Sequence, residues 1–192
     1  MSPSTSALIV AVVGVAGTLL SGVLAHRSTL RSKSMELGHE EQQRCEERLA
    51  EERREALNER RASYAALNQH LRHFHQALSR HFLVLEAGHA SAQQTQAREE
   101  SRRNLREVYA EAQMTVPDDV LTSGGNLVHQ LHRIHVLLSQ HEQEATTDEP
   151  LSDIKERLER ASESLYEVRQ TMRRDLGITE LPIRRPDGYG AT

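Results

Sequence analysis

The amino-acid sequence predicts an all-α protein with a single transmembrane helix near the N-terminus, a long charged helical stalk and an antiparallel helical bundle of about four helices. The 192 residues divide unevenly in hydropathy, because one short apolar block precedes a long polar remainder. Within that remainder apolar residues recur at three- and four-residue steps, and no stretch shows the strict alternation of a half-buried strand. The expected segments are a short extracytoplasmic tail (1–6), a transmembrane helix (7–25), a basic flank and stalk (26–61), the bundle (62–177) and a flexible tail (178–192).

The apolar block covers residues 7–25 and contains no charged residue over 19 positions. As a helix rising about 1.5 Å per residue, it is roughly as long as the 30 Å hydrocarbon layer of a bilayer is thick. The alternative is a cleaved secretory signal, for which Val23-Leu24-Ala25 offers a cleavage site of small residues. A membrane anchor is favoured because no Lys or Arg precedes the block, because it exceeds the usual apolar core of about 7–15 residues, and because basic residues follow it directly.

The residues that follow the block predict its orientation. Arg27, Arg31 and Lys33 come before the first acid, Glu36, and basic residues next to a membrane helix tend to stay in the cytoplasm. We therefore expect a single-pass protein of the plasma membrane with its N-terminus outside and its C-terminal domain in the cytoplasm. The lone Cys45 cannot form an intrachain disulfide, which agrees with a reducing compartment.

Small residues form one stripe along the predicted span and indicate a self-association face. They allow two helix backbones to approach closely, which favours association in lipid. The alternative is that small residues are simply common in membrane helices. The stripe consists of Ala7, Ala11, Gly14, Thr18, Ser21 and Ala25.

The stalk is expected to be a solvated helix that continues the anchor. Between residues 34 and 61 the sequence has nine acids and six arginines, with many opposite charges three or four positions apart. A loose two-stranded coiled coil is possible here if the anchors dimerise, although the large apolar residues are sparse.

Four amphipathic segments follow, and they predict the bundle. The first ends at Gly88, the second runs from about 91 to 114 before Pro117, the third from about 117 to 141, and the fourth from about Pro150 to Gly177. Their narrow apolar stripes predict a thin core, in which the second helix is the weakest member. The expected core positions are Leu57, Tyr64, Leu67, Leu71, Phe74, Leu78, Phe82 and Leu85; Ala97, Leu105, Val108, Tyr109 and Ala112; Val120, Gly124, Leu127, Leu131, Ile134 and Leu138; and Leu151, Ile154, Leu158, Ala161, Leu165, Val168 and Met172.

Eleven histidines are unusual for a chain of this length, and two groups of them share helix faces. Histidines three apart could chelate a metal ion with a carboxylate from a neighbour, or act as a pH sensor. Neither group has the glutamates that a metal-binding bundle needs, so we favour polar helix surface, with His135 or His81 at the edge of the core. No metal and no cofactor are expected. The two groups are His70, His73 and His75, and His129, His132 and His135.

The sequence also argues against an enzyme and against direct nucleic-acid binding. Cys45 lies in the charged stalk with glutamates on both sides, which discourage a thiolate, and Gly124-Gly125 lacks the lysine and the spacing of a phosphate loop. The net charge is −4, and arginines alternate with acids instead of forming a basic patch.

Three features of the layout occur together: the apolar N-terminal segment IVAVVGVAGTLLSGVLA, an R-x-x-x-Tyr-x-x-hydrophobic motif at Arg60, Tyr64 and Leu67, and the VYAEAQMTVPDDV segment with Tyr109 and Val116. In these features the chain resembles the KilB-type spread proteins of Streptomyces conjugative plasmids, a group from actinobacteria. It implies a part in moving plasmid DNA between hyphal compartments within a membrane-associated complex. It brings no catalytic or ligand-binding residues with it.

These observations predict a non-enzymatic membrane protein whose cytoplasmic bundle self-associates, as a homodimer, and recruits an unidentified protein partner, in plasmid spread. The alternative is a membrane-anchored module that senses metal or pH through its histidines.

Overall fold

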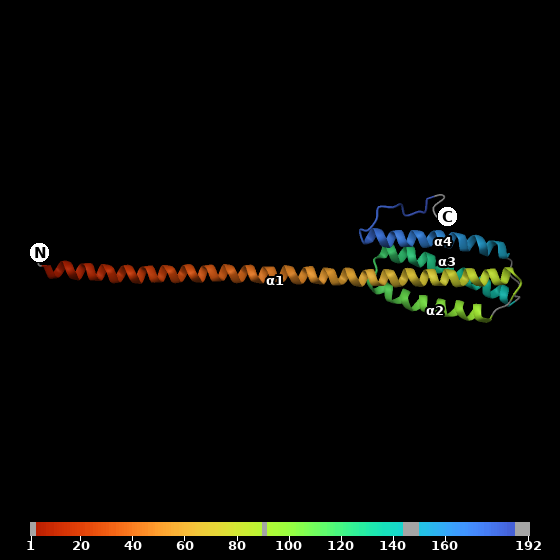
Figure 1. Ribbon diagram of the computed structural model, residues 1–192, viewed down its shortest axis with the longest axis horizontal. Helices are drawn as coiled ribbons and strands as arrows, with labels where there is room; N and C mark the ends of the chain where they lie inside the picture. Colours follow the sequence, from red (N-terminus) through yellow and green to blue (C-terminus); the bar gives the residue numbers. More distant parts are fainter. Residues whose placement is uncertain (1–2, 90–91, 144–149, 187–192) are drawn as a thin grey trace. The chain divides into compact units, whose positions relative to one another are not determined.

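The computed structural model describes residues 3–89, 92–143 and 150–186, with side chains described from residue 41 onward. Over these ranges the chain forms four α-helices and no strand, so the all-α prediction is confirmed (Figure 1). The three later helices begin and end within one or two residues of the bounds that the sequence predicts. The helices are α1 (Pro3–Glu86), α2 (Ala92–Thr115), α3 (Asp118–Glu142) and α4 (Leu151–Asp175).

The chain divides into two compact units, Met1–Glu55 and Ala56–Thr192. The first unit is helical backbone, and every side chain described in it is exposed. The second unit contains the C-terminal part of α1 together with α2, α3 and α4, and it holds the core.

The predicted single-pass membrane topology is corrected by the structure. In the portion of the chain that the structure describes, no helix is long and apolar enough to cross a membrane. A span needs about 20 mainly apolar residues, whereas every helix carries charged residues among the side chains that the structure describes. The placement in the plasma membrane, with the N-terminus outside and the domain in the cytoplasm, is therefore wrong. Residues 7–25 are helical in backbone, and their side chains lie outside the described part.

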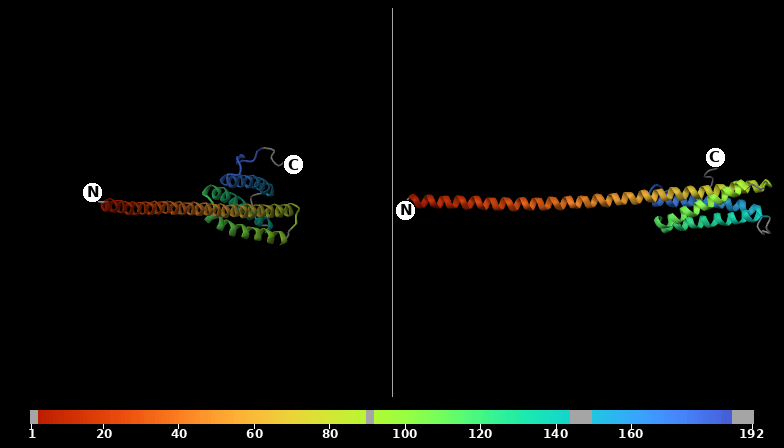
Figure 2. Two further views of the ribbon diagram at one scale, coloured as in Figure 1. Left: turned by 60° about the vertical axis from the view of Figure 1, so that its left-hand side comes forward. Right: turned by 90° about the horizontal axis from the view of Figure 1, so that it is seen from below.

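Contacts between residues at the same level of the bundle show that successive helices run in opposite directions. Tyr64 and His75 of α1 contact residues 175 and 158 of α4, so these two helices are antiparallel. The hydroxyl of Ser63 in α1 lies 3.0 Å from that of Thr115, the last residue of α2, so α2 runs back along α1 in the opposite direction. α1 and α3 run in the same direction, because Leu67 packs near Gly124 and His81 lies near Glu142. Two further views show the four helices of this unit side by side (Figure 2).

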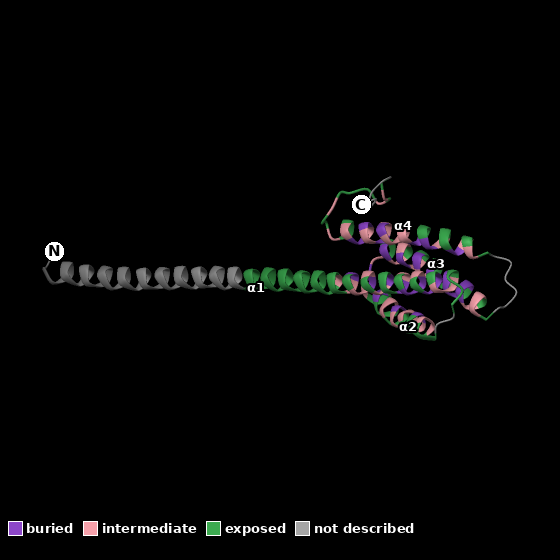
Figure 3. Ribbon diagram, turned by 45° about the vertical axis from the view of Figure 1, so that its right-hand side comes forward, coloured by how far each residue is buried: buried purple, intermediate pink, exposed green. Residues whose placement is uncertain are grey.

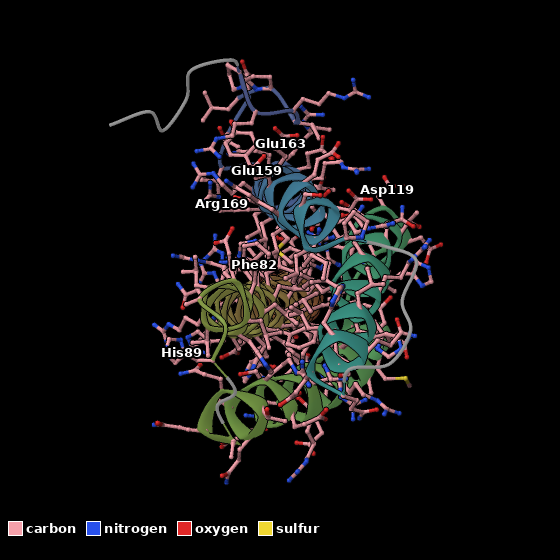
Figure 4. The ribbon with its side chains drawn as sticks, turned by 90° about the vertical axis from the view of Figure 1, so that its right-hand side faces the viewer. Phe82, His89, Asp119, Glu159, Glu163 and Arg169 are labelled. Atoms are coloured by element: carbon pink, nitrogen blue, oxygen red, sulfur yellow. The ribbon has the colours of Figure 1, made fainter. Side chains whose placement is uncertain are left out.

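One apolar core lies between the four helices. Its buried side chains come from every helix, and they coincide with most of the expected positions (Figure 3). Leu57 and Ala97 are exceptions, because both are exposed. Along the bundle, apolar side chains such as Phe82 fill the interior, while Glu159 and Glu163 of α4 stay exposed (Figure 4).

Glycines end two of the helices by the same device. Gly88 and Gly177 have φ values of 70° and 65°, which only glycine adopts without strain. The glycine N–H and the following N–H turn back to carbonyls of the last helical turn, as from His89 to Val84 at 3.0 Å. The breaks predicted after α1 and α4 are confirmed.

Two leucines of α1 provide a matched test of the core. Leu78 is fully buried and Leu83 is 59 % exposed. We expect Leu78→Ala to lower the free energy of unfolding by about 3 kcal/mol, because it leaves a cavity. Leu83→Ala is expected to change it by less than about 0.5 kcal/mol. Urea unfolding followed by circular dichroism measures both, and equal losses would contradict the assigned core.

Candidate functional site

A buried guanidinium is the most unusual feature of the bundle. Arg98 lies near the start of α2 and is 1 % exposed. Its Nη2 donates to the Ser139 hydroxyl at 3.0 Å and to the Glu142 carboxylate at 3.3 Å, both on α3. Its Nε and Nη1 have no hydrogen-bond partner among the described residues. Burial lowers the pKa of this guanidinium, and Glu142 opposes that shift, so the charge stays and needs its partner.

Glu142, at the end of α3, is the acid that pairs with the Arg98 guanidinium. It is the last residue of the helix, where the unpaired carbonyls carry partial negative charge and disfavour a carboxylate. The Thr95 hydroxyl donates to the other carboxylate oxygen. Two groups of α2 therefore hold one acid of α3, and they join the N-terminal part of α2 to the bundle.

Two buried histidines flank Arg98. His81 of α1 is completely buried, its Nε2 lies 4.0 Å from Glu142, and neither ring nitrogen has a hydrogen-bond partner in the described part. His135 of α3 is 7 % exposed, and its Nε2 lies 3.3 Å from Glu99. Burial first and Arg98 second lower the pKa of both, that of His135 to about 4. Both histidines are therefore neutral at neutral pH.

Glu99 links this site to the surface. Arg102, one turn later on α2, holds its carboxylate at 2.9 Å, and His135 lies on its other side. Partial burial raises the pKa of Glu99. The hydrogen bond from Arg102 and the nearby positive charges lower this pKa by more than burial raises it, so the net shift is downward. We name this group the Arg98 cluster; it comprises His81, Thr95, Arg98, Glu99, Arg102, His135, Ser139 and Glu142.

A second acid is bound at the opposite end of the bundle. Asp175 is the last residue of α4, and it accepts a hydrogen bond of 2.7 Å from the Tyr64 hydroxyl. Arg60 lies 3.4 Å from the same oxygen. Burial and the bonded carboxylate both raise the pKa of Tyr64. Arg60, Tyr64 and Leu67 are the motif residues of the KilB resemblance, and here they close α1 onto α4 and α3.

The two histidine groups that the sequence singles out lie on α1 and α3, and in each group two rings are neighbours, His70 with His73 and His132 with His135. His70 and His73 lie edge to face at 6.1 Å, and His75 contacts the Leu158 carbonyl at 3.0 Å. On α3, His129 and His132 are exposed, whereas His135 faces the core. Among the side chains from residue 41 onward that the structure describes, no three His, Cys, Asp or Glu groups are arranged to hold a metal ion.

The remaining predicted residues are placed only in part. Cys45 is exposed. The self-association face within 7–25 and the flanking Arg27, Arg31 and Lys33 lie outside the residues whose side chains are described.

Sequence reasoning placed His81 or His135 at the edge of the core but missed Arg98, Glu142 and Asp175. One signal could have revealed Arg98. It lies seven residues before Leu105, which lies seven before Ala112, and all three are buried on one stripe of α2. No pattern along the chain could have paired Arg98 with Glu142, because the two are 44 residues apart.

Over the described residues, fold and site together define a four-helix, up-and-down bundle with a buried ionic cluster. No protein-family model, curated protein or solved structure matches this chain. The resemblance to KilB-type proteins therefore stays a hypothesis that rests on its residues.

Removal of Arg98 tests the cluster. We expect Arg98→Ala to lower the free energy of unfolding by about 3 kcal/mol, because it leaves the Glu142 carboxylate without its charge partner and removes buried volume. Arg98→Met keeps most of that volume and should cost less. Arg103→Ala, on the exposed side of α2, serves as control, with a change under about 0.5 kcal/mol. Urea denaturation measures all three; a loss below 1 kcal/mol for Arg98→Ala would show that the cluster does not hold α2.

Proposed function

We propose that this protein is a non-enzymatic interaction protein that self-associates through the charged part of α1 and uses the bundle to recruit a partner. The observation that carries the proposal is that residues 41–59 are helical and that every one of them is exposed. Such a helix gains little burial from the described part of its own chain, and short-range charge pairs add only a few tenths of a kcal/mol each. A second copy would supply the missing contact.

Charge and shape of this segment support association with a second copy. It carries seven glutamates and four arginines, so opposite charges are interleaved along the helix. Leu49 and Leu57 are 46 % and 37 % exposed, and they are the large apolar side chains that a second helix would cover. Interleaved charges on paired helices select register and partner. The resemblance to KilB-type proteins adds conjugative plasmid spread to the proposal, as the process in which such an assembly acts.

Sedimentation equilibrium of the full chain tests self-association. We expect at least a dimer, and a shift towards monomer in Leu49→Glu/Leu57→Glu, because two buried charges would oppose pairing. Leu83→Glu makes the same change at an exposed leucine of α1 within the bundle and should leave the mass unchanged. A monomeric wild-type chain, or equal effects of both variants, would rule the proposal out.

A second candidate function is a pH-responsive bundle, and the burial of two histidines beside Arg98 favours it. Protonation of His81 or His135 would place a second positive charge next to the guanidinium. Glu99 and Glu142 offset part of that repulsion, while Arg102 and the exposed His132 add to it. Loss of this packing would loosen α2, whose N-terminal part depends on the cluster. Release of α2 by acid would change the surface that the bundle presents to a partner.

Stability against pH tests this candidate, and the sign follows from the pKa of His135, which falls from 6.5 to about 4 on folding. The unfolded chain binds the proton first, so stability is complete above pH 6.5, falls as the pH drops, and levels off near pH 4. The expected loss from His135 at pH 5 is about 2 kcal/mol. His135→Gln should remove that part, whereas His129→Gln, at an exposed position, should not. An unchanged pH profile in His135→Gln would refute the assignment.

A further inference from the structure

A cleft of about 420 Å³ lies on the bundle surface between α2 and α3. Its size falls within the range of small-molecule sites, which is roughly 300 to 1,000 Å³. Neither the interaction function proposed above nor the KilB resemblance uses it. We name it the α2–α3 cleft and define it by its floor, wall and rim.

The floor of the cleft is apolar. Phe74 of α1 and Leu105 of α2 are each 2 % exposed and form its base. Val128 of α3, half-buried, completes it. Because Phe74 and Leu105 are already buried, an apolar ligand body would displace water mainly from Val128 and from the half-buried Tyr109, at roughly 25 cal/mol per Å² of area buried.

One wall depends on a glycine. The Tyr109 hydroxyl lies so close to Gly125 that a Cβ there would meet it at 2.7 Å. The same hydroxyl lies 3.4 Å from the Leu121 carbonyl, which holds the ring against α3. The ring thus lines the cleft as a flat aromatic wall, and its position requires the absence of a side chain at 125.

The rim is basic. Arg102 and Arg106 stand one turn apart on α2, and His129 and His132 lie on α3. No Asp or Glu lines the cleft. Glu99 engages Arg102 from outside the cleft, whereas Arg106 has no ion pair or hydrogen bond among the described residues. This concentration of positive charge occurs on a chain whose net charge is −4.

We propose that the α2–α3 cleft binds a small organic anion with an apolar, planar body, of the aryl carboxylate class. The floor and the Tyr109 wall cover the planar body, and Arg106 pairs with the carboxylate at the rim. Arg102 belongs both to this rim and to the Arg98 cluster, so the bound anion competes with Glu99 for its guanidinium.

Calorimetric titration of the full chain with 2-naphthoate tests the site, with neutral 2-naphthamide as the matched ligand. We expect 2-naphthoate to bind at least about tenfold more tightly than the amide, because only the acid can pair with Arg106. Arg106→Glu should weaken 2-naphthoate binding about tenfold or more, since it replaces attraction by repulsion. Arg106 is exposed, so its replacement should keep the fold, and circular dichroism verifies this.

Arg80→Glu is the control, because Arg80 is an exposed arginine of α1 outside the cleft that makes no ion pair among the described residues, and the charge change is identical. It should alter the affinity less than twofold. The proposal is overturned if 2-naphthoate does not bind at millimolar concentration, if the amide binds equally well, or if both arginine variants weaken binding alike. None of these outcomes depends on self-association, so the test is independent of the proposed function.

Discussion

The bundle depends on the apolar stripe of α3, which α1 and α4 cover along its length. Leu127, Leu131 and Leu138 are completely buried, and so are Leu67, Leu71 and Leu78 of α1. Burial at this level is the main favourable term in folding, and the three- and four-residue steps keep it on one face of each helix. α2 contributes fewer buried apolar side chains than the other helices, Leu105 and Ala112 with the half-buried Val108 and Tyr109, so its attachment needs another source.

The additional attachment of α2 comes from polar contacts at the C-terminal end of α3, and similar contacts occur at the C-terminal end of α4. α3 and α4 both end on an acid, at a position where the helix dipole disfavours negative charge. Arg98 and Thr95 bind the acid of α3, and Tyr64 and Arg60 bind the acid of α4. The two contacts sit at opposite ends of the bundle. Because hydrogen bonds are directional, they fix the register of helices whose apolar stripes alone would allow sliding.

Among the residues that carry the KilB resemblance, those of the bundle have roles in packing. Leu67 is completely buried, Tyr64 and Arg60 hold Asp175, and the hydroxyl end of Tyr109 lies against Gly125. Such a motif identifies an architecture. Function is better sought in features that packing does not explain, such as the exposed helix before the bundle and the basic rim between α2 and α3.

The sequence by itself determined the helices, their ends and most of the core. Apolar spacing located the buried faces of α1, α3 and α4, and Pro117, Gly88 and Gly177 marked where helices begin or end, because these signals are local. The same local reasoning predicted a membrane span that the described helices do not supply. It also grouped the histidines by sequence distance, whereas His81 and His135 meet at one buried arginine from a third helix. Only the tertiary structure decided that meeting, since pairing a buried charge is settled by which helices lie side by side.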